Sequence, residues 1–233
     1  MPNTLKRSEI NRIMRESDAF IRSFGYVLPP FAYWTPGEFR ARRDDARAII
    51  DRSMGWDITD YGLGNFNDTG LFLFTVRNGN NADLRKGSGM LYAEKAMISR
   101  RDQYSPMHRH SLKAEDIINR GGATLVIELF GDTGGEIDRN KGTVVCTDGL
   151  RRDVPPGGLI KLAPGESVTL MPNEHWHAFW GEGGDVFIGE VSTVNDDATD
   201  NLFEDPRISR FSGIEEDEEP WHLLVSDYGT WLT

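Results

Sequence analysis

Histidine is scarce in this chain, with five among 233 residues, and four of the five form two pairs spaced two residues apart. These pairs are His108 with His110 and His175 with His177, and Glu115 follows the first pair. Residues two apart in a strand project from the same face. Imidazole nitrogens with one carboxylate make a mixed donor set that suits Mn, Fe, Co, Ni or Zn. The spacing therefore predicts one divalent metal held by the first pair, Glu115 and a histidine of the second pair.

The region that must position these residues, from Gly62 onwards, has the pattern of a β-structure. Short runs rich in β-branched and aromatic residues alternate with clusters of Gly, Pro, Asn and Asp, which mark turns. Eight runs are expected as strands: Leu71–Val76, Met90–Ile98, Thr124–Phe130, Gly142–Thr147, Leu159–Leu162, Ser167–Met171, Asp185–Val194 and Trp221–Ser226. No helical pattern separates them, which argues against a parallel α/β sheet and favours a sandwich or barrel.

The first 60 residues have a helical pattern instead. Apolar residues recur near helical spacing from Ser8 to about Phe24, with Ser8 as the expected N-cap. A second helix is expected from Pro36 to about Met54, because Thr35 and Pro36 form a typical helix start. We therefore predict a mainly β protein with a helical extension at 1–60, packed on a β-barrel domain at 61–233 as one structural unit.

Charge and composition exclude several partners. The formal net charge is −11 and the isoelectric point is near 4.9, so the surface repels phosphate backbones and we expect no nucleic acid partner. No stretch approaches the ~18 apolar residues of a membrane span, and the polar start of the chain lacks the pattern of a signal peptide. A cytoplasmic protein is the default expectation. The acidic run at 215–219 is expected to be a solvated loop.

The histidine spacing resembles the two motifs of the cupin superfamily. His108-x-His110-x4-Glu115-x6-Gly122 matches the first motif, and Pro172-x-Glu174-x-x-His177 resembles the second. The second motif favours His177 over His175 as the fourth ligand. Three turn positions depart from the usual pattern: Asp102 and Glu174 stand where glycine is usual, and Gly181 stands where asparagine is usual. The resemblance implies a cupin jelly-roll barrel, a fold that hosts many functions.

Longer segments resemble the bacterial D-lyxose isomerases over nearly the whole chain. They are Leu28–Ala32, Gly55–Asp57, Thr75–Gly79, Tyr92–Lys95, Glu115–Gly122 and Gly189–Asp197. The resemblance implies a metal-dependent sugar isomerase that interconverts D-lyxose and D-xylulose, often with D-mannose and D-fructose. It implies Mn²⁺, with Co²⁺, Fe²⁺, Ni²⁺ or Zn²⁺ as alternatives, on His108, His110, Glu115 and His177. It also points to a homodimer.

The reaction moves a hydrogen between C2 and C1 and needs a proton acceptor and a proton donor. The resemblance places a site lysine at Lys95 and suggests an acidic residue and an arginine near the C-terminus, for which Glu204 and Arg210 are the candidates. We expect Lys95, Glu204 and Glu115 to be catalytic, and Lys95, Glu190 and Arg210 to bind substrate. Guanidinium offers a fixed fork of donors to sugar hydroxyls.

Three questions stay open at the level of sequence. The substrate could be another aldose, such as L-ribose. The metal site could belong to an Fe(II) dioxygenase of the same superfamily. The hydrogen transfer could also proceed as a proton or as a hydride.

Overall fold

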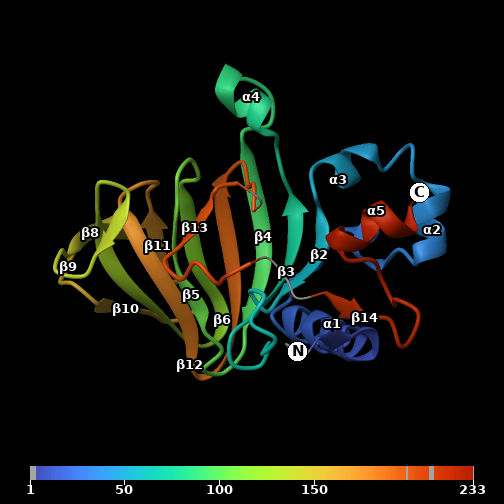
Figure 1. Ribbon diagram of the computed structural model, residues 1–233, viewed down its shortest axis with the longest axis horizontal. Helices are drawn as coiled ribbons and strands as arrows, with labels where there is room; N and C mark the ends of the chain where they lie inside the picture. The colour runs from blue at the N-terminus through green and yellow to red at the C-terminus, as the bar shows by residue number, and fades with distance from the viewer. Residues whose placement is uncertain (1–3, 198, 210–212, 233) are drawn as a thin grey trace.

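The computed structural model describes residues 4–197, 199–209 and 213–232. Curved β-strands form a barrel, and helices from both ends of the chain gather at one side of it (Figure 1). The helical elements are α1 (Arg7–Ser23), η1 (Pro30–Tyr33), α2 (Pro36–Ala41), α3 (Arg47–Asp51), α4 (Asn81–Lys86), η2 (Val225–Asp227) and α5 (Tyr228–Trp231). The strands are β1 (Leu5–Lys6), β2 (Gly55–Thr59), β3 (Leu71–Arg77), β4 (Tyr92–Ser99), β5 (Ser105–His110), β6 (Glu115–Thr133), β7 (Glu136–Asp138), β8 (Thr143–Thr147), β9 (Leu150–Val154), β10 (Gly158–Leu162), β11 (Ser167–Leu170), β12 (His175–Thr193), β13 (Asn201–Phe203) and β14 (Ile214–Glu215).

Two long antiparallel strands, β6 and β12, form the centre of the barrel. They pair along most of their length, and β12 pairs with β4 through its second half and with β5 through its first half. The register shifts between Glu182 and Val186, which is where the ribbon bends from one wall to the other. Gly122 sits opposite this bend with φ +96°, and a Cβ there would overlap the carbonyl oxygen of Asp185. Only glycine tolerates both conditions.

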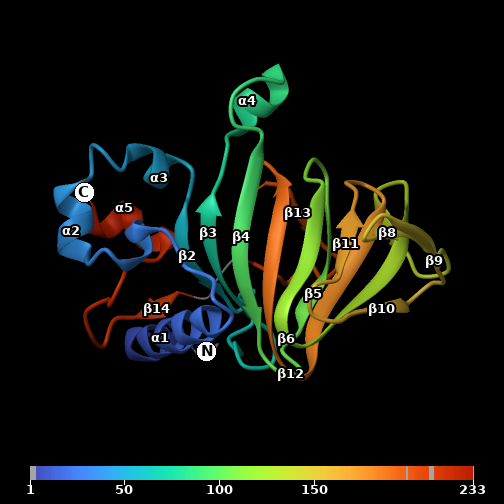
Figure 2. The ribbon, with the colours of Figure 1, turned by 180° about the vertical axis from the view of Figure 1, so that it is seen from behind.

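Helix α1 packs on the wall formed by β2, β3, β4 and β12, and in the view from behind it lies at the lower left, beside β14 (Figure 2). The spacing of its buried residues Ile10, Ile13, Met14 and Ile21 places them all on one face of the helix. They pack in one cluster with aromatic residues of the sheet, including Phe74. Burying each such side chain stabilises the fold by roughly 1.5–3 kcal/mol.

The predicted fold class is confirmed: the chain is mainly β, the strands of the large sheet pair antiparallel, and a helical segment precedes the barrel. Seven of the eight predicted strands lie on observed ones. The exception is Trp221–Ser226, which is no strand: its buried residues Leu223 and Leu224 pack into two different apolar clusters, and η2 follows. The run divides its apolar side chains between two clusters and enters η2 at Val225, so it does not continue as a strand.

The helical predictions need two corrections. The single helix expected from Pro36 to Met54 is two short helices, α2 and α3, because the intervening charged residues at 42–45 are exposed and offer no apolar face. The start at Thr35 is as expected, with a reciprocal capping box to Glu38. Helix α1 begins at Arg7 rather than after Ser8, and the Ser8 hydroxyl donates a hydrogen bond to Asp217 instead.

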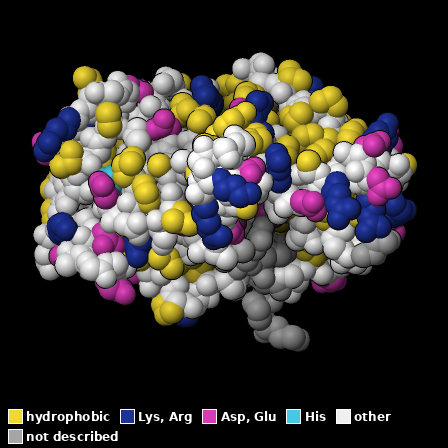
Figure 3. Space-filling view, turned by 90° about the horizontal axis from the view of Figure 1, so that it is seen from above, with side chains coloured by type: hydrophobic (Ala, Val, Ile, Leu, Met, Phe, Trp, Pro, Cys, Tyr) yellow, Lys and Arg dark blue, Asp and Glu magenta, His cyan; other side chains and the backbone are white. Residues whose placement is uncertain are grey.

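The surface is mixed in character. Seen from the side of α4, basic and acidic side chains alternate with groups of hydrophobic ones (Figure 3). The helices in the described part of the chain include none long and apolar enough to cross a membrane.

Candidate active site

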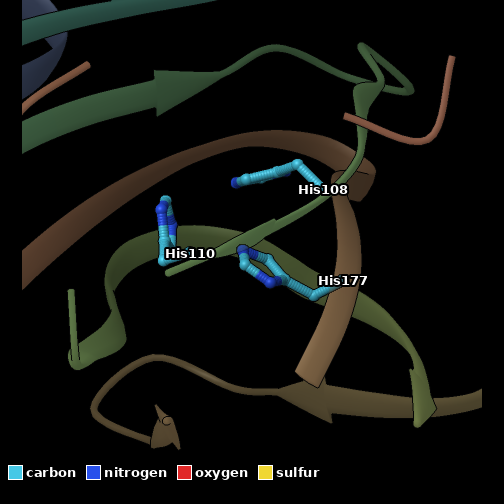
Figure 4. A group of neighbouring side chains, drawn as sticks. All are labelled: His108, His110 and His177. Atoms are coloured by element: carbon cyan, nitrogen blue, oxygen red, sulfur yellow. The ribbon is translucent and has the colours of Figure 1, made fainter. Parts of the chain in front are cut away.

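Three histidines converge inside the barrel (Figure 4). His108 and His110 project from the same face of β5, and His177 of β12 stands in register with His108. All three are buried, and one nitrogen from each lies within 4.8 Å of the others. Alternation along β5 selects the two even-numbered side chains, and the pairing of β5 with β12 brings the third. The structure thus assembles the histidines that spacing and motif selected, and it does so from two distant segments.

Glu115, the first residue of β6, is the fourth member of this group. One carboxylate oxygen, Oε1, lies 3.3 Å from Nε2 of His110 and 3.3 Å from Nε2 of His177. The turn between His110 and Glu115 is held by Asp200, whose carboxylate accepts hydrogen bonds from the backbone N–H groups of residues 111, 112 and 113. Asp200 is buried, and it fixes where the strand carrying Glu115 begins.

The donor set fits a metal ion by two observations. The side-chain nitrogens of His110 and His177 are buried, and among the described residues none of their contacts, the 3.3 Å approach of Glu115 included, has hydrogen-bond geometry. An unsatisfied buried polar group costs about 1–3 kcal/mol, which a bound cation would offset. Nδ1 of His108 lies 2.7 Å from the carbonyl oxygen of Pro106; donation of that N–H leaves Nε2 as the free donor atom, the usual arrangement for a metal-binding imidazole.

Electrostatics keeps these side chains in the forms that bind metals. Burial lowers the pKa of His108 well below its ordinary value, and the neighbouring histidines lower it further. Burial and the positive charge of Lys113 lower the pKa of His110. Burial opposes ionisation of Glu115, but Lys113 and His110 outweigh it and hold the pKa of this carboxyl well below its usual range. Neutral imidazole and ionised carboxylate are the ligating forms.

The histidines face a pocket of about 420 Å³ inside the barrel. Its polar lining includes Lys95, Lys113, Glu190 and Asp197 in addition to Glu115, and its apolar lining includes Leu71, Leu73, Met97, Ile117 and Phe179. The volume exceeds that of a small sugar, so a substrate and several waters fit together. A site of this kind offers both charged groups and apolar surfaces to a sugar.

The charged side chains of the pocket are joined in one chain of alternating sign. Nζ of Lys113 lies 2.7 Å from Glu115 and 3.0 Å from Glu190. Nζ of Lys95 lies 3.7 Å from Glu190 and 3.2 Å from Asp197. Burial disfavours the charge on Lys113, but its two carboxylate neighbours outweigh this and raise the pKa of the ammonium. The pocket therefore contains two ammonium groups, each held between two carboxylates.

The predicted residues Lys95 and Glu190 are both buried and both line the pocket. Three residues of the site were not predicted from the sequence: Lys113, Asp197 and Asp200. Lys113 lies in the turn before β6, where strand alternation gives no indication of side-chain direction, and its closeness in sequence to Glu115 was the one available signal. Asp197 and Asp200 follow the last long strand, where the sequence indicates only turns.

The structure does not bring Glu204 to the pocket. Its carboxylate binds the guanidinium of Arg139, and its side chain is 31% exposed. The preceding residue, Phe203, lines the pocket, so alternation turns Glu204 to the other side. Arg210 lies outside the described residues.

His175 takes a different role from His177. Its Nδ1 lies 2.8 Å from the hydroxyl oxygen of Thr143, and it is absent from the described lining of the pocket. Burial, with the nearby ring of His177, lowers the pKa of His175 to about 4.

Comparisons with known proteins agree on one family. A sequence model of the D-lyxose isomerase family matches residues 5–228. The D-lyxose/D-mannose isomerase of Serratia proteamaculans is 43% identical over 227 residues, which cover 96% of this chain and 98% of the relative. The enzyme of the same name from Escherichia coli O157:H7 is 41% identical over 229 residues, with the same coverage of 96% and 98%.

Solved structures show the same fold at low identity. The L-ribose isomerase of Cellulomonas parahominis superposes with a TM-score of 0.61 at 14% identity, over 92% of this chain and all of that one. The L-ribose isomerase of Geodermatophilus obscurus gives 0.58 at 16% identity, with 92% of this chain and 100% of that one covered. This likeness concerns the cupin-type fold alone. On the match over residues 5–228 and the relatives above 40% identity, the chain belongs to the D-lyxose isomerase family and is an aldose–ketose isomerase.

Proposed function

We propose that this isomerase interconverts D-lyxose and D-xylulose, and also D-mannose and D-fructose, with a divalent cation held by His108, His110, Glu115 and His177. The names of the two relatives above 40% identity support the sugars. The observation that carries the metal is the set of buried histidine nitrogens without hydrogen-bond partners, facing a pocket beside a buried carboxylate. Nitrogen and carboxylate donors suit several first-row divalent ions, and Mn²⁺ is our first candidate among them.

The chemical problem is the weak acidity of the C2–H bond. When the proton leaves, its electron pair forms the C1=C2 bond of an enediol, and negative charge develops on O1. A divalent cation in the four-residue site would supply Lewis-acid stabilisation of that charge. The walls of the pocket restrict the sugar to one orientation, which removes an entropic part of the barrier.

We assign the proton transfers to Glu190 and Lys95. The Glu190 carboxylate takes the proton from C2, while the Lys95 ammonium gives a proton to O1. Ketose forms when Glu190 returns its proton to C1 and Lys95 recovers one from the O2 hydroxyl, so that both residues regain their starting states. Both side chains are about 4% exposed, so little water competes for these protons. Glu190 replaces Glu204 in this role because Glu190 lines the pocket and Glu204 does not.

Lys113 positions the two carboxylates. Its ammonium lies between the ligand Glu115 and the proposed base Glu190, so it fixes the separation of the metal site from the proton acceptor. Arg210 stays a prediction as a residue that orients sugar hydroxyls, as do the homodimer and the cytoplasmic location.

The test is a panel of aldoses with the metal-loaded protein. We expect turnover of D-lyxose and D-mannose, with slower turnover of L-ribose, and we expect loss of turnover after metal removal by a chelator and recovery with Mn²⁺. Glu190→Gln should lower kcat by ~10²-fold or more, the usual contribution of a positioned base. The proposal fails if none of D-lyxose, D-mannose and D-xylulose is converted. Oxygen uptake by the Fe²⁺ form without sugar conversion would favour the dioxygenase alternative.

A further inference from the structure

Asp197 is the one described residue that lines both the active-site pocket and a second cavity near the β3–α4 connection. This second cavity is more polar, has a volume of about 250 Å³ and lies between the β3–α4 connection and the segment after β12. Asn78, Asn80, Asn81 and Asp196 are among the other residues of this second cavity. Asp197 therefore stands at the boundary between the two.

Exposure changes sharply along the charged chain of the pocket. The side chains of Glu190 and Lys95 are each about 4% exposed, whereas Asp197 is 24% exposed. Lys95 touches both: Nζ lies 3.7 Å from Glu190 on its inner side and 3.2 Å from Asp197 on its outer side. Among the described residues, these are the two carboxylates within ion-pair distance of Lys95, and Asp197 is the more exposed of the two.

From this arrangement we propose that Asp197 is a positioning residue that connects Lys95 to solvent, and that active-site protons exchange with water through Lys95 and Asp197 into the second cavity. This inference rests on the proposed function, because it assigns an exit to the proton that Glu190 removes from C2. The chemistry needs no further reactant than water.

The exchange balances at every step. After the first half-reaction, Glu190 is a neutral acid and Lys95 is a neutral amine. Transfer of the proton from Glu190 to Lys95 restores the carboxylate and the ammonium. The ammonium then passes one proton to the Asp197 carboxylate, Asp197 releases it to water, and a solvent proton returns by the reverse path to Glu190. In D₂O the returning particle is a deuteron, and it is delivered to C1 of the ketose.

The experiment measures deuterium at C1 of fructose formed from D-mannose in D₂O at low conversion, by NMR, with metal-loaded full-length protein. The wild type should incorporate deuterium in a large share of turnovers. Asp197→Asn should lower deuterium per turnover by about tenfold, a modest part of the effect that positioned acids and bases have on proton transfer. It should lower kcat much less, since the internal transfer between C2 and C1 remains available.

Two further variants guard against a merely structural effect. Asp197→Glu keeps the carboxylate and should restore deuterium incorporation. Asp196→Asn is the matched control, because Asp196 lines the second cavity and binds Asn81 but is absent from the described lining of the pocket; it should behave as the wild type. Asp197→Asn with lower kcat but unchanged deuterium per turnover would overturn the relay and leave Asp197 as an anchor for Lys95.

Failure of the relay and failure of the proposed function give different results. If the wild type converts mannose but places no deuterium at C1, hydrogen moves internally or as a hydride, and the relay is wrong while the isomerase assignment stands. If the wild type converts no aldose, the proposed function fails and the relay falls with it.

Discussion

Two of the places where the described residues bury charged groups differ in one respect. At the junction of the chain ends, the guanidinium of Arg7 is fully buried and makes four hydrogen bonds, two to Glu216 and two to Asp227. Inside the barrel, Lys113 and Lys95 are almost as buried, but they line the same cavity as His110 and His177, whose nitrogens have no hydrogen-bond partner among the described residues. The Arg7 side chain is enclosed by protein atoms, whereas Lys95 and Lys113 face the active-site cavity.

This difference separates a structural ion cluster from a functional one. A buried charge is tolerated when hydrogen bonds replace its water shell, and Arg7 meets that condition with its neighbours alone. The buried nitrogens of His110 and His177 have no such hydrogen bonds among the described residues, and a bound cation would give them a partner. Breaking the first cluster should therefore affect folding, and breaking the second should affect chemistry.

The largest effect is expected at His177. His177→Ala should abolish tight metal binding and lower kcat by ~10³-fold or more, because Lewis-acid stabilisation contributes several kcal/mol to the barrier. His175→Ala is the matched control two residues away: it loses a hydrogen bond to Thr143 but no predicted ligand. Metal content by elemental analysis and sugar turnover measure both. Equal metal loss in the two variants would show that the ligand at this strand was misassigned.

Arg7 should show the opposite pattern. Arg7→Met leaves the carboxylate of Asp227 buried without its partner, so the free energy of unfolding should fall by about 3–5 kcal/mol. Urea denaturation measures this, and kcat of the protein that remains folded should be unchanged. Arg12→Met, which removes an exposed pair with Glu16 on the same helix, should cost no more than ~0.5 kcal/mol. A comparable loss of unfolding free energy in both variants would mean that the buried Arg7 cluster stabilises the fold no more than an exposed ion pair does.

The two clusters also show which features were visible in the sequence. The metal group depends on local spacing: His108, His110 and Glu115 lie within eight residues, and strand alternation orients them. The Arg7 cluster joins residues more than 200 positions apart, and nothing near Arg7 indicates its partners. The acidic run expected as a solvated loop is indeed exposed, yet three of its members, Glu216, Asp217 and Glu218, bind the start of α1.

The residues proposed for proton transfer were predictable only in part from the sequence. Lys95 and Glu190 face each other across the β4–β12 pair, and both lie in strands that the sequence predicted. Asp197 and Glu204 depend instead on the path of an irregular segment after β12, where no periodicity constrains side-chain direction. That is why resemblance to the family suggested a C-terminal acidic residue but could not say which one reaches the pocket.

A smaller effect is expected at Glu204. Its carboxylate forms a partly exposed pair with Arg139, so Glu204→Gln should cost at most ~1 kcal/mol of stability and leave kcat essentially unchanged. Steady-state kinetics on D-mannose, run beside Glu190→Gln, measures the contrast. A loss of ~10²-fold or more in the Glu204 variant would return that residue to the role of base and place the sugar differently from our assignment.

The smallest effect is expected at His222, a histidine in the helical region rather than the pocket. Its Nδ1 lies 3.0 Å from the carbonyl oxygen of Trp34, to which it donates a hydrogen bond, and its buried Nε2 has no hydrogen-bond partner in the described part of the chain. Burial lowers its pKa, although the Trp34 carbonyl and the charges of Asp18 and Glu38 act in the other direction.

The sign of the pH effect follows from proton counts. Because the folded-state pKa of His222 lies below the ordinary value, the unfolded chain binds more protons in acid, and this residue's contribution to stability is complete above about pH 6.5 and declines as pH falls. His222→Asn keeps a donor for the Trp34 carbonyl but does not titrate. The free energy of unfolding, measured by urea denaturation at pH 7 and pH 5, should therefore fall more in the wild type than in the variant. An equal fall in both would mean that protonation of His222 costs no stability in the folded protein. Its Nε2 would then be more accessible to water than the buried nitrogens of His110 and His177.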